Sequence, residues 1–261
     1  MAAHTTHQQP EQLAWAELIP QQEWALYRQV LDAAAAGNVQ FALGGGFAFS
    51  YYARRWRDTK DIDLYVLPSQ REAMIRILQE TGWKDCYDQK PYDRAWIYRG
   101  CREGVITDII WAMANQRATT DPVWMQRARH VDIRGLSVAI LPVEEFFWAK
   151  LYVLQRDRSD WPDLLNVLLV QGATMDWEHL LGRADDDARL VGGLLSVFAW
   201  MCPAQARELP EWLWGRVGLQ RPASNNDCHL DPTRVRLLDT RDWFGPKNGQ
   251  IARNQATFQQ P

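Results

Sequence analysis

Apolar and polar residues alternate strictly in one short segment of the N-terminal half of the chain. Ile62, Leu64 and Val66 recur at every second position, which is the spacing of side chains on one face of a β-strand. Asp61 and Asp63 alternate with them and therefore share the opposite face. The pattern predicts a strand that turns an apolar face toward the core and presents two neighbouring carboxylates on the other.

A glycine cluster lies just upstream of this strand. Residues 39–43 predict a short strand that ends at Gly44, Gly45 and Gly46, and residues 47–55 predict a helix that begins directly afterwards. Glycine lets a ligand approach the backbone closely, and the first N–H groups of a helix have no partner within it. The order strand, glycine turn, helix therefore favours the binding of a phosphate group.

The same periodicities divide the rest of the chain into a mixed first part and a helical second part. The expected elements are a helix over residues 21–36, a helix over 70–81, strands over 95–98 and 105–111, a hairpin that turns at Arg134-Gly135, and helices within 144–154, 163–170 and 177–181. Strands and helices in mixed order, with hairpin-like returns, indicate an α+β fold rather than a doubly wound parallel sheet.

We expect four regions along the chain, with the main boundary near Pro142, where the pattern becomes helical. They are a disordered or loosely packed N-terminus over residues 1–18, a core over 19–142, a helical domain over 143–218, and a polar, partly disordered tail over 219–261.

Composition and charge exclude several classes of function. A net charge of −3 argues against a general nucleic-acid coat, because such binding depends on many contacts between cations and phosphates. The longest weakly polar run, residues 191–204, is shorter than the roughly 20 apolar residues that a membrane span needs, so we expect a buried helix and no membrane association.

The cysteines and the N-terminus suggest a compartment. Cys86, Cys101, Cys202 and Cys228 form no C-x-x-C pair, and the histidines do not lie at zinc spacing from them. The first residues lack the basic segment and apolar core of a signal peptide. We therefore expect reduced thiols and a cytoplasmic protein.

The paired carboxylates predict a metal site. Asp61 and Asp63 side by side repel each other unless a cation neutralises them, and hard oxygen ligands suit Mg²⁺ or Mn²⁺. Asp108 lies in a segment rich in β-branched residues and is expected in a buried strand, where an unpaired aspartate is costly. Its partner is either a metal or an arginine in a salt bridge. Asp132, on the expected hairpin, ranks below Asp108 as the third carboxylate.

Together these motifs resemble the DNA polymerase β-like nucleotidyltransferase superfamily, and within it the bacterial branch of abortive-infection (type IV toxin) and minimal nucleotidyltransferases. The matching segments are Gly45-Gly46-Phe47-Ala48-Phe49, Arg57-x-Thr59-x-Asp61-Ile62-Asp63-Leu64, Lys150, and Arg158-x-Asp160-x-x-Asp163-Leu164. The resemblance implies a polymerase β-like palm, a mixed sheet flanked by helices, followed by a helical C-terminal region.

The resemblance also implies roles for individual residues. Asp61, Asp63 and Asp108 would be catalytic and hold Mg²⁺ (or Mn²⁺) in a two-metal mechanism. The nucleotide-binding residues for an NTP would be Gly45, Gly46, Arg57, Thr59 and Lys150.

Some of these positions have other readings. Many superfamily members have Ser or Thr where this chain has Phe47, so phosphate contact would fall to backbone amides, Ser50 or a basic side chain. A solvated side chain is the alternative for Lys150. Asp160, just before Trp161-Pro162, also predicts a helix N-cap.

The leading hypothesis is transfer of a nucleoside monophosphate from an NTP to an acceptor hydroxyl, with release of pyrophosphate. The sequence leaves open whether the acceptor is an RNA 3′ end, a protein hydroxyl or a small molecule. The alternative is a weakly active or non-catalytic nucleotidyltransferase-like module that serves a partner protein in a toxin–antitoxin type system. A glycosyltransferase that uses Asp-x-Asp for a nucleotide sugar ranks third, because there the motif normally closes an apolar strand, whereas here the apolar residues follow it.

Overall fold

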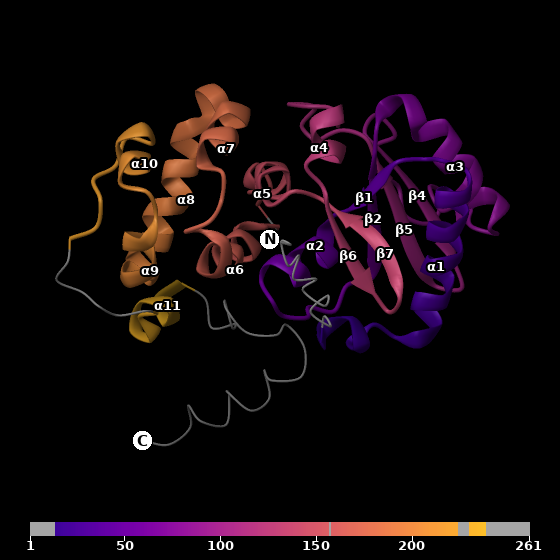
Figure 1. Ribbon diagram of the computed structural model, residues 1–261, viewed down its shortest axis with the longest axis horizontal. Helices are drawn as coiled ribbons and strands as arrows, with labels where there is room; N and C mark the ends of the chain where they lie inside the picture. The colour runs from indigo at the N-terminus through magenta and orange to yellow at the C-terminus, as the bar shows by residue number, and fades with distance from the viewer. Residues whose placement is uncertain (1–13, 157, 224–229, 239–261) are drawn as a thin grey trace, which may run out of the picture. The chain divides into compact units, whose positions relative to one another are not determined.

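The computed structural model describes residues 14–156, 158–223 and 230–238 (Figure 1). The chain forms two compact units. Of these described residues, the first unit contains those up to Gly44, Lys60–Ala114 and Thr119–Leu141, and the second contains Gly45–Thr59, Asn115–Ala118 and those from Pro142 onward. Both units are therefore discontinuous in sequence, and the glycine cluster lies where the chain passes from one to the other.

A seven-stranded mixed sheet forms the centre of the first unit. The strand order is β3-β4-β5-β2-β1-β7-β6, in which β2 runs parallel to β5, β1 runs parallel to β7, and all other neighbours are antiparallel. This arrangement confirms the expected α+β class. The strands are β1 (Phe41–Leu43), β2 (Asp61–Val66), β3 (Lys84–Asp85), β4 (Ile97–Arg102), β5 (Val105–Ile110), β6 (Arg129–Ile133) and β7 (Leu136–Ile140).

One face of this sheet is covered by helices α1 (Gln21–Ala36) and α3 (Arg71–Glu80), as Figure 1 shows. The strand register identifies the residues on that face. Ile62 pairs with Thr107 and Thr107 pairs with Gly100, so the three form one row across the sheet. A side chain added at Gly100 would meet α3, so this row lies on the face that α3 covers. Ile62 is fully buried there, as are the other two apolar residues of its strand. The alternation in the sequence therefore predicted the core face of β2 correctly.

The opposite face carries the carboxylates. Asp63 pairs with Asp108 across the parallel strands, and Asp108 pairs with Arg99 across the hairpin of β4 and β5. Tyr65 continues this face of β2 and stacks on Trp124 of α4 (Pro122–Gln126), with ring centroids 5.7 Å apart.

Turn residues set the ends of several elements. The hairpin of β6 and β7 turns at Arg134 and Gly135, whose φ angles are 51° and 76°, as the sequence predicted. Helix α2 (Gly45–Tyr52) begins and ends earlier than the predicted range 47–55. It stops before Arg54, which has a φ of 53° that a right-handed helix cannot accommodate.

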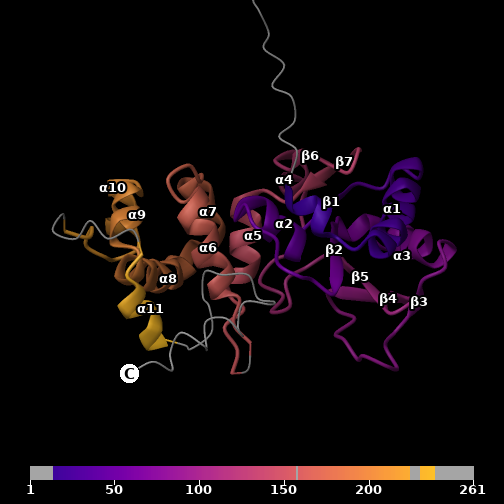
Figure 2. The ribbon, with the colours of Figure 1, turned by 90° about the horizontal axis from the view of Figure 1, so that it is seen from below.

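The second unit is helical. Helices α5 and α6 contact each other and both contact α2, α7 contacts α5 and α8, and α8 also contacts α6 (Figure 2). No helix among the residues in this description is both long enough and apolar enough to cross a membrane. The remaining helices are α5 (Val143–Leu151), α6 (Trp161–Gln171), α7 (Trp177–Ala184), α8 (Ala188–Met201), α9 (Pro203–Glu208), α10 (Glu211–Arg216) and α11 (Pro232–Leu238).

Two expectations concern chain ends that the structure covers only in part. The predicted loosely packed N-terminus includes residues 1–13, and the predicted polar tail includes 224–229 and 239–261, all outside the described residues. Of the first region, Ala14–Leu18 forms a 3-10 helix in which Trp15 and Ala16 are buried.

The expectation of reduced thiols is wrong for one pair of cysteines. Cys86 and Cys101 form a disulfide, with Cα atoms 5.7 Å apart. The antiparallel register of β3 and β4 sets Asp85 opposite Gly100, so the residues that follow each of them become diagonal neighbours. Spacing along the sequence does not reveal this pairing. Cys202 is buried outside any disulfide, and Cys228 lies beyond the described residues.

The close packing at Gly44 generates a prediction for stability. A Cβ atom at Gly44 would overlap the ring of Tyr65, which cannot retreat because it stacks on the buried Trp124. We expect Gly44→Ala to lower the free energy of unfolding by about 1–3 kcal/mol, as overpacking does. Urea denaturation followed by circular dichroism measures it.

The matched control is the same substitution at Gly182, an exposed position within α7 where nothing lies near an added Cβ. Gly182→Ala should stabilise the protein by about 0.5–1 kcal/mol, because alanine restricts the unfolded chain and favours the helix. Equal effects of the two substitutions would contradict the packing argument.

Candidate functional site

Three carboxylates from two neighbouring strands converge on one face of the sheet. Asp61 and Asp63 project from β2 and Asp108 from β5, and one oxygen from each lies within 4.8 Å of the others. The parallel register produces this arrangement, because it sets Asp63 directly opposite Asp108. Asp61 and Asp63 are partly exposed, whereas Asp108 is buried.

The donor set fits a divalent metal ion. Three acidic side chains offer only hard oxygen ligands, which Mg²⁺ and Mn²⁺ prefer. Carboxylates held this close repel one another, and a divalent cation relieves that repulsion. The three predicted metal ligands are therefore brought together in an arrangement that can hold such an ion. Asp132 is not among them: it is exposed, and its Oδ1 accepts a hydrogen bond from the Gly135 N–H within the hairpin turn.

Arg99 is a residue of this site that sequence reasoning missed. Its Nε and Nη2 donate to Oδ1 and Oδ2 of Asp108 over 2.7 and 2.6 Å. Burial raises the pKa of Asp108, and the hydrogen bonds and charge of Arg99 act against that rise. The sequence left a metal ion and an arginine as alternative partners of Asp108, and the structure is compatible with both at once. The arginine is present, and Asp108 still lies within reach of the other two carboxylates.

The turn between β4 and β5 is the sequence feature from which the position of Arg99 could have been predicted. Glu103 and Gly104 both have positive φ angles, 53° and 83°, and form a two-residue turn between Arg102 and Val105. Counting three residues back along β4 and three forward along β5 sets Arg99 opposite Asp108. The predicted strand over residues 95–98 ended too early for this count.

The glycine turn supplies backbone N–H groups at the start of α2. The N–H of Gly44 donates to the carbonyl oxygen of Asp63 over 2.9 Å, so it belongs to the sheet. Gly45 begins the helix with a φ of 47°, which favours glycine. A Cβ at Gly46 would lie 2.8 Å from Thr59, so only glycine fits there. The turn therefore places two of the predicted nucleotide-binding residues, Gly46 and Thr59, in contact.

Two side chains near this turn belong to the core. Phe47 is buried and packs edge-on against Trp56, with ring centroids 6.3 Å apart. Ser50, one of the expected phosphate contacts, is also fully buried, and its hydroxyl donates to the carbonyl oxygen of Gly46 over 2.8 Å. Phosphate contact through Ser50 is therefore wrong, and backbone N–H groups and basic side chains remain.

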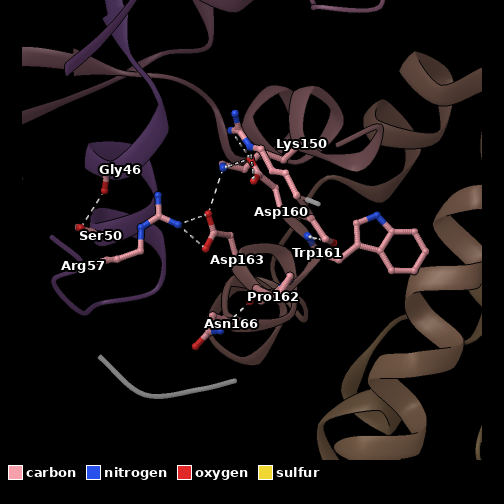
Figure 3. A network of polar contacts seen from close by, with 11 residues as sticks. Gly46, Ser50, Arg57, Lys150, Asp160, Trp161, Pro162, Asp163 and Asn166 are labelled. Carbon is pink, nitrogen blue, oxygen red and sulfur yellow. Dashed lines mark hydrogen bonds and ion pairs between the residues drawn. The ribbon is translucent and has the colours of Figure 1, made fainter. Parts of the chain in front are cut away.

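Arg57 and Lys150 meet in a network of ion pairs centred on Asp163 (Figure 3). Arg57 Nη1 donates to both carboxylate oxygens of Asp163, and its guanidinium lies over the ring of Phe49. Lys150 Nζ donates to Asp163 over 3.0 Å and to Asp160 over 2.5 Å. One buried carboxylate thus holds two of the predicted nucleotide-binding cations.

This network corrects two expectations. Lys150 is not a solvated lysine, because it is buried and paired with two aspartates. Asp160 does occupy the N-cap position of α6, but its side chain makes no capping hydrogen bond and binds Lys150 and Arg158 instead.

The network also shifts the acidity of its aspartates. Burial by itself would raise the pKa of Asp160, but the charge of Lys150 and the hydrogen bonds from Arg158 and Lys150 outweigh it and lower that pKa to about 2. The pKa of Asp163 is likewise lowered, because Lys150 and Arg57 overcome the effect of burial. Both aspartates are therefore ionised at neutral pH.

The predicted site residues thus fall into two sets, each within one unit. The carboxylates Asp61, Asp63 and Asp108 lie in the first unit. The second unit contains all the predicted nucleotide-binding residues: Gly45, Gly46, Arg57, Thr59 and Lys150.

Comparison with known proteins places this arrangement in context. The profile of a family described as uncharacterised nucleotidyltransferase matches residues 25–187, which is more than half of the chain and includes both sets of residues. No curated protein matches the sequence.

Several solved structures are similar to the chain. The solution structure of the antibiotic-resistance factor ANT(2'')-Ia is 19% identical, covers 69% of this chain and 92% of its own, and has a TM-score of 0.41. The lincosamide antibiotic adenylyltransferase LnuA is 16% identical, with coverages of 57% and 96% and a TM-score of 0.40. A protein from Thermotoga maritima that is described as a nucleotidyltransferase is 16% identical, with coverages of 50% and 83% and a TM-score of 0.39.

The low pKa of Asp160 predicts a specific dependence of stability on pH. A group whose pKa is lower in the folded state stabilises the protein fully above its unfolded pKa near 3.9, and this contribution is lost as the pH falls toward about 2. We expect Asp160→Asn to remove about 2 kcal/mol at pH 7 and to flatten the stability curve between about pH 4 and pH 2. Urea denaturation at a series of pH values measures this.

Asp186→Asn, at an exposed position of a short 3-10 helix, is the matched control and should follow the wild-type curve. If Asp160→Asn lost as much stability between pH 4 and pH 2 as the wild type, the ion pairs would not be the cause of the acid sensitivity.

Proposed function

We infer that this protein transfers a nucleoside monophosphate from an NTP to an acceptor hydroxyl and releases pyrophosphate, because the chain belongs to the family described as uncharacterised nucleotidyltransferase. The observation that carries the proposal is the convergence of three carboxylates, with ligand oxygens within 4.8 Å of one another, inside the region that matches the family. A complete set of three carboxylates is what metal-dependent catalysis needs, and its presence weighs against a non-catalytic module that serves a toxin–antitoxin partner.

The acidic residues would hold divalent ions. Asp61 and Asp63 lie on one face of the same strand, and Asp108 completes the set from the neighbouring strand. When bound, Mg²⁺ or Mn²⁺ stabilises the charge on the attacking and leaving oxygens and lowers the pKa of the acceptor hydroxyl. Both oxygens of Asp108 accept hydrogen bonds from Arg99, which orient the carboxylate and favour its ionised form. We therefore assign Asp108 to metal binding.

The second unit would bind the phosphates. The N–H groups of Gly45 and Gly46 begin α2, where the helix dipole favours an anion. Lys150 has three ammonium hydrogens, and Asp160 and Asp163 occupy two of them, which leaves the third for a phosphate oxygen. Arg57 keeps further N–H donors beyond the Nη1 group that binds Asp163. The two cations are thus held in place before the nucleotide arrives.

The acceptor is tested directly by label transfer. Each α-labelled NTP is incubated with the protein and Mg²⁺ or Mn²⁺, in the presence of bacterial RNA, protein or small-molecule fractions. We expect label in one fraction, which identifies the acceptor class. Label in none of the fractions, although NTP binds, would favour the non-catalytic partner module.

Removal of either paired aspartate tests the metal site. Asp61→Asn and Asp63→Asn should abolish metal-dependent label transfer and leave the thermal unfolding temperature unchanged or slightly higher, because repulsion between the carboxylates is relieved. Full activity in both variants would contradict the proposed role of these residues. Asp132→Asn, which alters only the hairpin turn, is the control that should keep activity.

Neutralising one cation tests the phosphate site. Lys150→Gln should weaken NTP binding by about 10–100-fold, because a hydrogen bond to a charged group contributes about 1.5–3 kcal/mol. Isothermal titration calorimetry with a non-hydrolysable NTP measures the affinity. Arg158→Gln is the control: this arginine also binds Asp160, but its side chain is 65% exposed, and its loss should leave the affinity within about twofold of the wild type. Equal effects of the two substitutions would contradict a direct role for Lys150.

A further inference from the structure

The ion pair of Arg99 and Asp108 is held by the sheet itself. The two residues are directly opposite each other in the antiparallel pairing of β4 and β5, so their side chains leave the same face side by side. The guanidinium makes two parallel hydrogen bonds of 2.7 and 2.6 Å to the carboxylate, which fixes the plane of that carboxylate as well as its position.

The same row of the sheet continues into the acidic triad. Asp108 is opposite Asp63 on its other side, so Arg99, Asp108 and Asp63 follow one another across three strands. The Asp108 side chain is only 3% exposed, whereas that of Arg99 is 25% exposed. The arginine therefore approaches a buried carboxylate from one side, while the other two acidic residues lie on its opposite side.

The hydrogen bonds leave room for a further ligand on Asp108. Each carboxylate oxygen has two lone pairs, and the guanidinium fork uses one on each oxygen. A second lone pair on each oxygen remains for a cation. Carboxylates that bind metals are generally hydrogen-bonded to such outer partners, whose removal typically weakens metal affinity by about 10–100-fold.

We propose that Arg99 is a positioning residue for the metal site, which orients the Asp108 carboxylate toward Asp61 and Asp63 and so strengthens the binding of the divalent ion. The inference rests on the proposed function, because it takes the three aspartates as metal ligands. The competing view is that Arg99 replaces a metal as the partner of Asp108. In that case, removing the arginine would leave metal affinity unchanged or, through the added negative charge, increase it.

The two views are separated by Mn²⁺ binding to the full-length protein, measured from the electron paramagnetic resonance signal of free Mn²⁺ without any substrate. We expect Arg99→Gln to weaken binding by about 10–100-fold. Arg99→Lys keeps the charge but donates from a single point, so it should fall between Arg99→Gln and the wild type. If Arg99→Gln fails to fold, as judged by circular dichroism, the Mn²⁺ affinity of Arg99→Lys is compared with that of the wild type instead, and weaker binding supports the proposal.

Arg102→Gln is the matched control. Arg102 belongs to the same strand and is equally exposed, at 26%, but it lies on the other face and binds Gln29 and the carbonyl oxygen of Thr81. Its loss should leave Mn²⁺ affinity unchanged.

Two results would overturn these conclusions separately. Wild-type affinity in Arg99→Gln or Arg99→Lys, at a site that Asp61→Asn abolishes, would refute the role of Arg99 and leave the proposed function standing. Absence of any Mn²⁺ site that depends on Asp61 in the wild type would refute the metal site itself, and the inference with it.

Discussion

The parallel pairing of β2 with β5 is the constraint from which the chemistry of this protein follows. In a strand, side chains alternate between two faces, so a shift of one residue in the register would turn Asp108 to the face that α3 covers. The apolar residues of β2 fix the face on which Asp61 and Asp63 lie, because Ile62 and its neighbours must remain in the core. The pairing of β5 with β2 then sets Asp108 on the same face, beside two carboxylates that repel it.

Both units compensate buried acids with cations on neighbouring elements. In the first unit a guanidinium binds Asp108 from the next strand, and in the second Asp163 binds Arg57 and Lys150 from two other segments. A buried carboxylate without a partner would be strongly destabilising, so these pairs are needed for folding as well as for any ligand. Each pair also restricts a long side chain to one geometry, which reduces the entropy lost when a ligand binds.

Much of the fold and of the acidic triad was predictable from local patterns. The alternation around Ile62 gave β2 and the face of each aspartate, and the β-branched run around Asp108 gave a buried strand. What local patterns could not provide was pairing between segments. Arg99 becomes visible only through the register of β4 and β5, and the disulfide of Cys86 only through that of β3 and β4.

The discontinuity of the two units has the same origin. The sequence shows that residues 45–59 lie between two strands, and it therefore assigns them to the sheet domain. In the structure this segment packs with the later helices, because α2 buries most of its residues, Phe47 among them, and contacts α5 and α6. Whether an apolar helix packs on the sheet or on other helices depends on tertiary contacts, and hydrophobic periodicity alone does not distinguish the two.

The charge balance of the cation network indicates how it would select a ligand. Arg57, Lys150 and Arg158 contribute three positive charges, of which the carboxylates of Asp160 and Asp163 offset two. A cluster with a single excess positive charge, in a chain of net charge −3, attracts anions only weakly at long range. Affinity for a triphosphate would then depend on donors at fixed positions, namely the third ammonium hydrogen of Lys150 and the first N–H groups of α2. Such a site discriminates by geometry, and it favours a ligand whose phosphate oxygens match these donors over anions in general.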